Sequence, residues 1–120
     1  MKKIINDAFT FVEDTLAGIP KAHPGQLTRV PGSNRALMRA DCPVKGKVAT
    51  VTGGGSSHLP VFLGYVGRGL CDGVATGNVF SSPPADDMLA AIRGVPDAGA
   101  TAVARLLGSI AVHTAEKERA

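Results

Sequence analysis

A buried strand that runs directly into three consecutive glycines is the feature that most constrains this sequence. Residues 47–52 read Lys-Val-Ala-Thr-Val-Thr, a β-branched run typical of a buried strand in an α/β sheet. Residues 53–58 follow at once and read Gly-Gly-Gly-Ser-Ser-His. In α/β proteins, ligands bind beside the carboxyl ends of the strands. The sequence therefore predicts a candidate ligand loop over residues 53–58.

The residue types in this loop suit a ligand rich in oxygen atoms. Successive glycines permit close backbone approach and positive φ angles, so that their amides can converge on one ligand. Ser56 and Ser57 add hydroxyl groups, and His58 adds a side chain that exchanges a proton near neutral pH. The combination favours a polyol, a sugar or a phosphate whose hydroxyl group must lose a proton. These residues alone leave open a tight strand-to-helix connection with serine caps and a half-exposed histidine.

Two better-known glycine motifs do not fit this loop. A phosphate-binding P-loop needs lysine and then serine or threonine after its last glycine, whereas Ser57, His58 and Leu59 stand here. A dinucleotide-binding fingerprint would need glycine at position 58. The second group of glycines, within residues 64–69, matches neither motif and is predicted to form a turn.

The rest of the chain alternates predicted helices with short predicted strands. Apolar residues recur at spacings of three and four over residues 5–18, which predicts an amphipathic helix. A second helix is predicted to begin at Ser81-Ser82-Pro83-Pro84, with a serine as its N-cap, and to run to Arg93, with Asp86 and Asp87 near its positive end. The other predicted elements are a hairpin of strands over 27–30 and 36–38, a short apolar segment over 61–66, a strand within 70–80 and an alanine-rich helix over 100–116.

Length, composition and charge restrict the classes of function. A chain of 120 residues with 44% hydrophobic residues allows one domain with a modest core. The net charge of +3 comes from scattered basic residues without interleaved aromatic residues, which argues against nucleic-acid binding. Acidic residues behind Lys2 and Lys3 argue against a signal peptide, and no apolar run approaches the roughly eighteen residues of a membrane span. The sequence predicts a soluble, cytoplasmic protein.

The two cysteines, Cys42 and Cys71, are predicted to be reduced thiols. One bridge between them is possible in principle, but the chain shows no secretory disulfide framework. Their spacing also lacks the pattern of a metal site, so no bound metal is expected.

The strand and loop over residues 47–60 resemble the substrate loop of the dihydroxyacetone kinases, in their ketone-binding K subunit (DhaK). That family typically shows a strand followed by Gly-Gly-Gly-Ser-Gly-His-Glu-Pro. The similarity extends upstream through residues 2–7 and through residues 17–24, which include an Ala-His-Pro turn. Downstream it includes Gly-Tyr-Val-Gly over 64–67 and the stretch that ends in Phe-Ser-Ser-Pro over 80–83. The resemblance covers about residues 1–97.

The resemblance implies phosphorylation of dihydroxyacetone or a related short ketose. The histidine that matches His58 acts as the acid and base on the hydroxyl to be phosphorylated, and the positions that match Gly55 and Ser56 line the substrate, with Ser57 adjoining. A ketose hydroxyl is a poor nucleophile, and a neighbouring imidazole can accept its proton during phosphoryl transfer. In the family a second histidine, far beyond position 120, holds the ketone as a covalent hemiaminal. The phosphoryl donor is ATP, or ADP held by a partner L subunit, with magnesium in both cases, so no cofactor is expected on the matching residues.

Three features depart from the family's pattern. Ser57 stands where the family has glycine, which would cost about 1 kcal/mol if that position needed a positive φ. Leu59 replaces an acidic residue that could orient the imidazole. Beyond the acidic helix the family continues with another buried strand and a substrate-contacting loop, whereas residues 98–120 indicate an alanine-rich helix.

We therefore predict an α/β fold with an incomplete open sheet flanked by helices. Residues 1–97 would form the amino-terminal fragment of a DhaK-like domain, and residues 98–120 a divergent helical tail. The predicted function is that of a truncated dihydroxyacetone kinase subunit without activity of its own. The alternatives are a non-catalytic ketose-binding or regulatory module and a non-functional remnant. The resemblance implies an L subunit and a second copy of the chain as partners, although the divergent tail argues against a homodimer.

Overall fold

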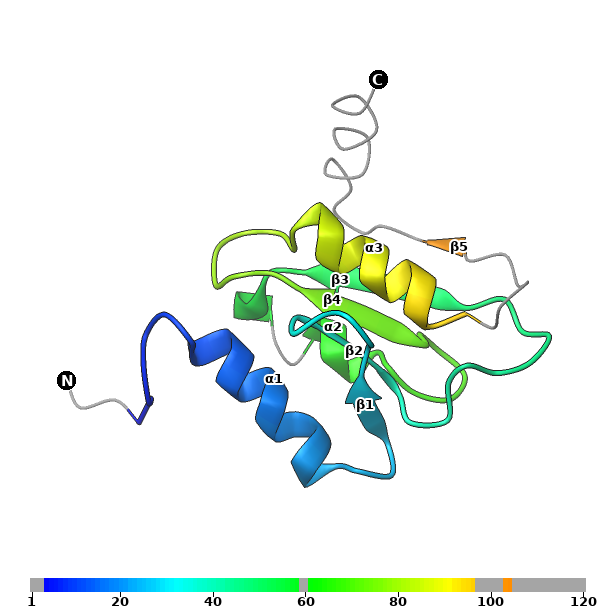
Figure 1. The fold of residues 1–120 in the computed structure, drawn as a ribbon, viewed down its shortest axis with the longest axis horizontal. Helices are drawn as coiled ribbons and strands as arrows, with labels where there is room; N and C mark the ends of the chain where they lie inside the picture. Colours follow the sequence, from blue (N-terminus) through cyan, green and yellow to red (C-terminus); the bar gives the residue numbers. More distant parts are fainter. Residues whose placement is uncertain (1–3, 59–60, 97–102, 105–120) are drawn as a thin grey trace, which may run out of the picture.

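One five-stranded sheet organises the computed structural model, which describes residues 4–58, 61–96 and 103–104 (Figure 1). The strands are β1 (Leu27–Arg29), β2 (Ala36–Arg39), β3 (Thr50–Gly54), β4 (Gly73–Thr76) and β5 (Val103–Ala104). Their order in the sheet is β1-β2-β4-β3-β5. β2 pairs antiparallel with β1 and β4, whereas β3 pairs in parallel with β4 and β5. The predicted α/β fold with an open sheet is confirmed.

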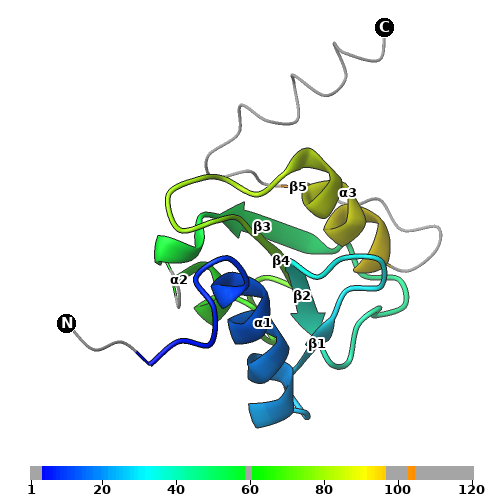
Figure 2. The ribbon, with the colours of Figure 1, turned by 60° about the vertical axis from the view of Figure 1, so that its left-hand side comes forward.

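Helices cover both faces of this sheet (Figure 2). α3 (Ala85–Gly94) packs on one face, and α1 (Phe11–Ala22) and α2 (Val61–Gly64) lie on the other. Because strand side chains alternate between the two faces, β2 and β4 contribute to two cores. The core under α3 consists of Val30, Ala36, Met38, Ala49, Val51, Ala75, Met88, Ala91 and Val95. The core under α1 and α2 consists of Val12, Leu16, Leu27, Leu37, Leu63 and Val74.

The hairpin predicted over 27–30 and 36–38 is confirmed by β1 and β2. Leu27 lies opposite Arg39, and Arg29 lies opposite Leu37. The side chain of Arg29 donates a hydrogen bond of 3.1 Å to Asn34 Oδ1 in the connecting turn.

Helix α1 begins and ends later than the predicted range of 5–18. The Asp7 carboxylate accepts hydrogen bonds from the amides of Phe9 at 2.6 Å and Thr10 at 3.3 Å, which fixes a turn ahead of the helix. The helix then continues through Gly18 and Pro20 to Ala22. A proline so close to the end of a helix removes only one backbone hydrogen bond, so the helix tolerates it.

Helix α3 also begins later than predicted, at Ala85. Pro84 occupies the N-cap position, and no side chain caps the helix, so the prediction of a serine cap is wrong. Ser81 belongs instead to a turn in which its amide donates to the Asn78 carbonyl at 3.4 Å. The two predicted aspartates do lie in the first turn, where the helix dipole favours negative charge.

The central strands are shorter than their apolar runs. β3 begins only at Thr50 but includes Gly53 and Gly54, which pair with Ala75 and Thr76 of β4. β4 begins at Gly73, within the predicted range of 70–80. The apolar segment predicted over 61–66 contains the short helix α2.

The strand β5 corrects the prediction for the tail. Val103 and Ala104 pair in parallel with Thr50 and Val51 of β3, although residues 100–116 were expected to be helical. Pairing satisfies backbone groups along the free edge of β3, which outweighs the helical propensity of these residues. A strand therefore follows α3, as it does in the family that the sequence resembles. The remainder of the expected helix lies outside the described residues, and the division of the chain at residue 97 stays a prediction.

Both cysteines are free thiols. Burial raises the pKa of Cys42 and of Cys71, so neither is activated as a thiolate. Within residues 4–58, 61–96 and 103–104, no helix combines the length and the apolar character that crossing a bilayer requires.

Candidate functional site

The segment 53–58, called the glycine loop below, lies beside the segment 77–82, called the β4 loop, at the carboxyl end of the sheet. The Gly54 carbonyl accepts a hydrogen bond from the Gly77 amide at 2.9 Å. The Asn78 carbonyl accepts one from the Ser56 amide at 3.0 Å. Two backbone hydrogen bonds therefore join the loops at the end of parallel strands where α/β proteins bind ligands.

Glycines in the glycine loop allow close packing and do not supply an unusual backbone conformation. The described glycines with positive φ are Gly32, Gly46 and Gly69, none of which belongs to this loop. A Cβ at Gly53 would lie 2.6 Å from Met88 Sδ, and a Cβ at Gly55 would lie 3.0 Å from the Ser81 carbonyl oxygen. The positive φ angles that a run of glycines permits are therefore not used here.

Ser56 and Ser57 occupy different environments in the short 3-10 helix η1 (Ser56–His58) that follows β3. Ser57 is exposed. Ser56 is only 9% exposed, and its Oγ has no hydrogen-bond partner among the described residues. Leaving a buried hydroxyl without a partner costs about 1–3 kcal/mol. Ser56 Oγ would therefore gain from a hydrogen bond to a ligand hydroxyl.

Replacing Ser57 with glycine, the family's residue, is expected to lower the free energy of unfolding by about 0.5 kcal/mol. In the described part of the chain no residue other than glycine has a positive φ, so serine at position 57 carries no strain for glycine to relieve. Glycine would give the unfolded chain more freedom. Urea unfolding followed by circular dichroism measures the difference. A gain in stability would show that position 57 is strained.

The backbone of His58 ends η1, directly beyond Ser57. Its side chain lies outside what the structure describes, and so does Leu59. The role of His58 as acid and base, and the effect of the missing acidic residue beside it, therefore stay predictions.

Two buried hydroxyl groups near the glycine loop could not be recognised from the sequence. Thr52 is 3% exposed and Thr76 is 2% exposed, and neither Oγ1 has a partner among the described residues. The strand register places both on the face of Val74, toward α1 and α2. Alternation along the strands indicates which residues share a face. It does not indicate which hydroxyls lack a partner, because that depends on tertiary packing.

The sequence also did not predict a bridge of charged and polar side chains on the same face of the sheet. The Arg35 guanidinium donates from Nη1 to Asn78 Oδ1 at 2.8 Å and from Nε to Glu13 Oε1 at 2.9 Å. The hydrogen bond from Arg35 lowers the pKa of Glu13, which keeps this carboxylate charged. The bridge therefore connects α1 to the β4 loop across the turn that precedes β2.

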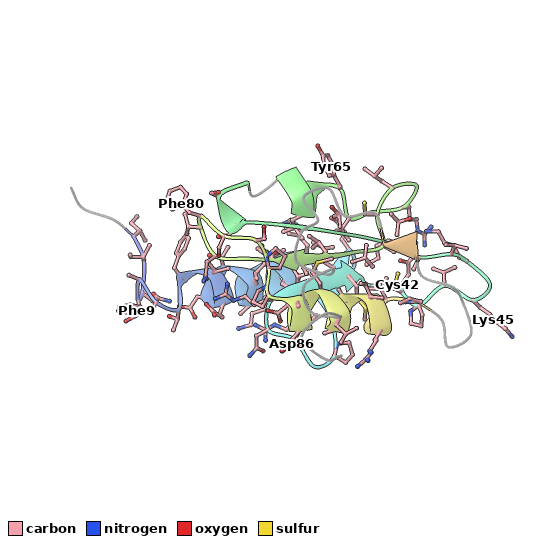
Figure 3. All side chains as sticks on the ribbon, turned by 90° about the horizontal axis from the view of Figure 1, so that it is seen from above. Phe9, Cys42, Lys45, Tyr65, Phe80 and Asp86 are labelled. Atoms are coloured by element: carbon pink, nitrogen blue, oxygen red, sulfur yellow. The ribbon has the colours of Figure 1, made fainter. Side chains whose placement is uncertain are left out.

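The opposite end of β3 and β4 carries a buried ion pair. Asp72 is 1% exposed and accepts hydrogen bonds from Arg39 Nη1 at 2.6 Å, from Lys47 Nζ and from the Thr50 amide at 2.9 Å. Lys45 and Cys42 lie toward this end, away from Phe80 (Figure 3). The pair holds the strands together and is remote from the glycine loop.

Exposed phenylalanines lie at the end of the molecule that carries the glycine loop (Figure 3). Phe80 of the β4 loop is 94% exposed, and Phe9 is 93% exposed. For a metal ion, the described residues offer no group of three His, Cys, Asp or Glu side chains.

Comparison with known proteins gives a match over most of the chain. The sequence model described as "Dak1 domain" matches residues 17–107. The dihydroxyacetone-binding subunit DhaK of the PEP-dependent dihydroxyacetone kinase of Escherichia coli (strain K12) is 46% identical over 87 residues. This alignment covers 72% of the present chain and 24% of the E. coli protein.

Solved structures share the fold. The dihydroxyacetone kinase of C. freundii matches with a TM-score of 0.77 and 29% identity, over 98% of this chain and 23% of that one. The same kinase in complex with AMP-PNP and Mg²⁺ matches with a TM-score of 0.72 and 32% identity, over 88% of this chain and 19% of that one. The dihydroxyacetone kinase operon co-activator Dha-DhaQ matches with a TM-score of 0.73 and 33% identity, over 88% of this chain and 33% of that one.

These matches establish the family and show that the chain corresponds to only part of each longer protein. The chain spans about a quarter of the length of the E. coli relative and a third or less of the solved proteins. The match over residues 17–107 includes the glycine loop, the β4 loop and the strand β5. With most of its residues inside that match, the chain belongs to the Dak1 domain family.

Proposed function

We propose that this chain binds a short ketose, dihydroxyacetone or a close relative, in the glycine loop and presents one of its hydroxyl groups for phosphorylation. The observation that carries this proposal is the buried Ser56 hydroxyl, which has no hydrogen-bond partner in the part of the chain that the structure describes and stands where the glycine loop meets the β4 loop. Kinship with proteins named for dihydroxyacetone supports the choice of ligand.

In this proposal Gly55, Ser56 and Ser57 line the substrate and His58 is the acid and base. Gly55 lets the glycine loop pack closely on the β4 loop, since a Cβ there would lie 3.0 Å from the Ser81 carbonyl oxygen. Ser56 Oγ would exchange hydrogen bonds with a ketose hydroxyl, and the His58 imidazole would accept the proton of the hydroxyl that is phosphorylated. Removing this proton makes the oxygen a better nucleophile as the phosphoryl group arrives.

The phosphoryl donor would come from outside these 120 residues. We assign ATP, or ADP on a nucleotide-binding L subunit, to a partner or a further domain, with its magnesium. The covalent histidine implied by the resemblance would also lie elsewhere, so the 120 residues on their own would not complete a catalytic cycle. The free thiols of Cys42 and Cys71 suit the reducing cytoplasm in which we place this reaction.

A non-catalytic ketose sensor is the second candidate. The similarity to the operon co-activator Dha-DhaQ favours it, since that protein's name describes regulation. A sensor needs the binding residues of the glycine loop but neither a covalent histidine nor a phosphoryl donor. Binding and turnover therefore have to be measured separately.

Binding of dihydroxyacetone to the full chain, measured by calorimetry, tests the proposal. His58→Ala and Ser56→Ala are each expected to weaken binding by about tenfold or more, because each removes a hydrogen-bonding group worth about 1.5 kcal/mol or more. His23→Ala is the matched control, since His23 is exposed and lies at the end of α1. Equal affinity of all four proteins would contradict the proposed site.

Turnover distinguishes the kinase fragment from a complete enzyme. Mixed with an L subunit, ATP and dihydroxyacetone, the chain is expected to form no dihydroxyacetone phosphate. Formation of product that requires the chain would show that the 120 residues and the L subunit together suffice for catalysis. Aggregation of the chain without ketose binding would favour the non-functional remnant.

A further inference from the structure

The glycine loop is held by the β4 loop, and that loop has little internal support. The Asn78 carbonyl accepts from the Ser56 amide at 3.0 Å and from the Ser81 amide at 3.4 Å. Asn78 itself is exposed, as are its neighbours Val79 and Phe80. The position of the Ser56 amide thus depends on a residue that the hydrophobic core does not fix.

The Arg35 side chain supports the β4 loop by a hydrogen bond to Asn78. Its Nη1 donates to Asn78 Oδ1 at 2.8 Å, while Nε at 2.9 Å and Nη2 at 2.5 Å both donate to Glu13 Oε1. The Arg35 side chain is 16% exposed; its hydrogen bonds to Glu13 are partly buried, whereas the one to Asn78 is exposed. A planar guanidinium that is fixed on one edge by a carboxylate holds its other edge in a defined direction.

The backbone of Arg35 is also anchored. Its carbonyl accepts from the Thr76 amide at 2.7 Å, at the last residue of β4. Its amide donates to Ser33 Oγ at 3.0 Å, and that hydroxyl donates to Asp87 Oδ1 of α3 at 2.6 Å. Arg35 is therefore connected to the sheet, to α1 and to α3 before it reaches Asn78.

We propose that Arg35 is a positioning residue for the glycine loop. By holding Asn78 it fixes the β4 loop, and through the hydrogen bond between the Ser56 amide and the Asn78 carbonyl it sets where Gly55 and Ser56 stand. The consequence for ketose binding rests on the proposed function. The effect on the order of the loop does not, because it concerns the protein without ligand.

Hydrogen exchange of single amides, followed by NMR on the full chain without ligand, tests the positioning role. Arg35→Gln is expected to lower the protection of the Ser56 amide about tenfold, the size expected for the loss of one charge-assisted hydrogen bond. The Asp72 amide, which donates to the Thr50 carbonyl at 2.7 Å, is expected to keep its protection. Arg29→Gln is the matched control, since Arg29 also donates to an asparagine, but this is Asn34 in the turn between β1 and β2 and not Asn78 in the β4 loop.

Two changes at Asn78 keep the test decisive if Arg35→Gln does not fold. Asn78→Ala removes only the exposed acceptor and is expected to expose the Ser56 amide in the same way. Asn78→Asp keeps an acceptor for Arg35 and is expected to retain the protection. Unchanged protection of Ser56 in Asn78→Ala, or equal losses at Ser56 and Asp72, would overturn the positioning role.

Calorimetry with dihydroxyacetone then tests the consequence for binding. The dissociation constant is expected to rise about tenfold in Arg35→Gln and in Asn78→Ala, and to stay unchanged in Asn78→Asp and Arg29→Gln. If the unaltered chain binds no dihydroxyacetone, the proposed function fails, while the exchange data still decide whether Arg35 orders the loop. If it binds and the Arg35 variant binds equally well, the positioning role in binding is wrong.

Discussion

Replacing Gly77 with alanine is expected to lower the free energy of unfolding by about 3 kcal/mol. Gly77 is buried at the end of β4, and a Cβ at this position would lie 2.1 Å from the Ser81 carbonyl oxygen and 2.5 Å from the Ser82 carbonyl carbon. Both contacts are with backbone, so the β4 loop would have to move as a whole. Because the Gly77 amide donates to the Gly54 carbonyl, that movement would also separate the glycine loop from its support.

Urea unfolding of the full chain, followed by circular dichroism, measures this loss. Gly18→Ala provides the matched control, since a Cβ at Gly18 meets nothing within 4 Å. Inside α1, this second exchange of glycine for alanine is expected to raise the free energy of unfolding by about 1 kcal/mol. Opposite signs for the two substitutions are the expected result. A Gly77 variant as stable as the unaltered chain would show that the two loops are not packed as described.

The parts of the fold that were predictable depend on contacts close in sequence. The hairpin of β1 and β2 follows from two short apolar runs separated by turn residues. The buried strand before the glycine loop follows from a β-branched run. In both cases neighbouring residues decide the structure, so the pattern was sufficient to find the element.

Element boundaries were less predictable because single side chains decide them. The Asp7 carboxylate binds the amides of Phe9 and Thr10 and so delays α1. Serine is a good helix cap by type, but Ser81 belongs to a turn with Asn78, and α3 starts only after Pro84. Each residue type permits more than one local structure, and tertiary contacts select one of them.

The strand β5 shows the limit of local patterns most clearly. Alanine-rich sequence around Val103 has helical spacing, yet Val103 pairs with Thr50, far away in the chain. For the candidate site the same distinction holds. The glycine loop was identified from consecutive residues, whereas the bridge of Glu13, Arg35 and Asn78 joins three separate segments that no sequence window contains.

Replacing Asp72 with asparagine is expected to lower the free energy of unfolding by about 4 kcal/mol at pH 7. Asp72 is 1% exposed and accepts hydrogen bonds from Arg39, which is 6% exposed, and from Lys47. Asparagine keeps the shape but removes the charge, so the Arg39 guanidinium stays buried with a single carboxylate partner, Asp41. An incompletely neutralised buried charge is among the most damaging changes that a small domain can suffer.

The effect of this substitution is expected to depend on pH. Burial alone would raise the pKa of Asp72, but hydrogen bonds from Lys47, from the Thr50 amide and from Arg39 outweigh it, and the pKa lies below its ordinary value of 3.8. A carboxyl group with a lowered pKa contributes stability that is complete above its unfolded pKa and is lost as the pH falls through its folded pKa. The difference in stability between the unaltered chain and the variant is therefore expected to shrink below about pH 4.

Urea unfolding at pH 7 and pH 5 and at a series of pH values below 4 measures this dependence, with Asp86→Asn as the control. Asp86 is exposed in the first turn of α3, so its loss is expected to cost far less. Dihydroxyacetone binding separates stability from the site: Asp72 lies beside the start of β3, and the glycine loop begins at its other end. The folded fraction of the Asp72 variant is therefore expected to bind dihydroxyacetone with unchanged affinity, whereas the Gly77 variant is not. A stability difference that persists unchanged below pH 3 would show that the charge of Asp72 does not stabilise the sheet.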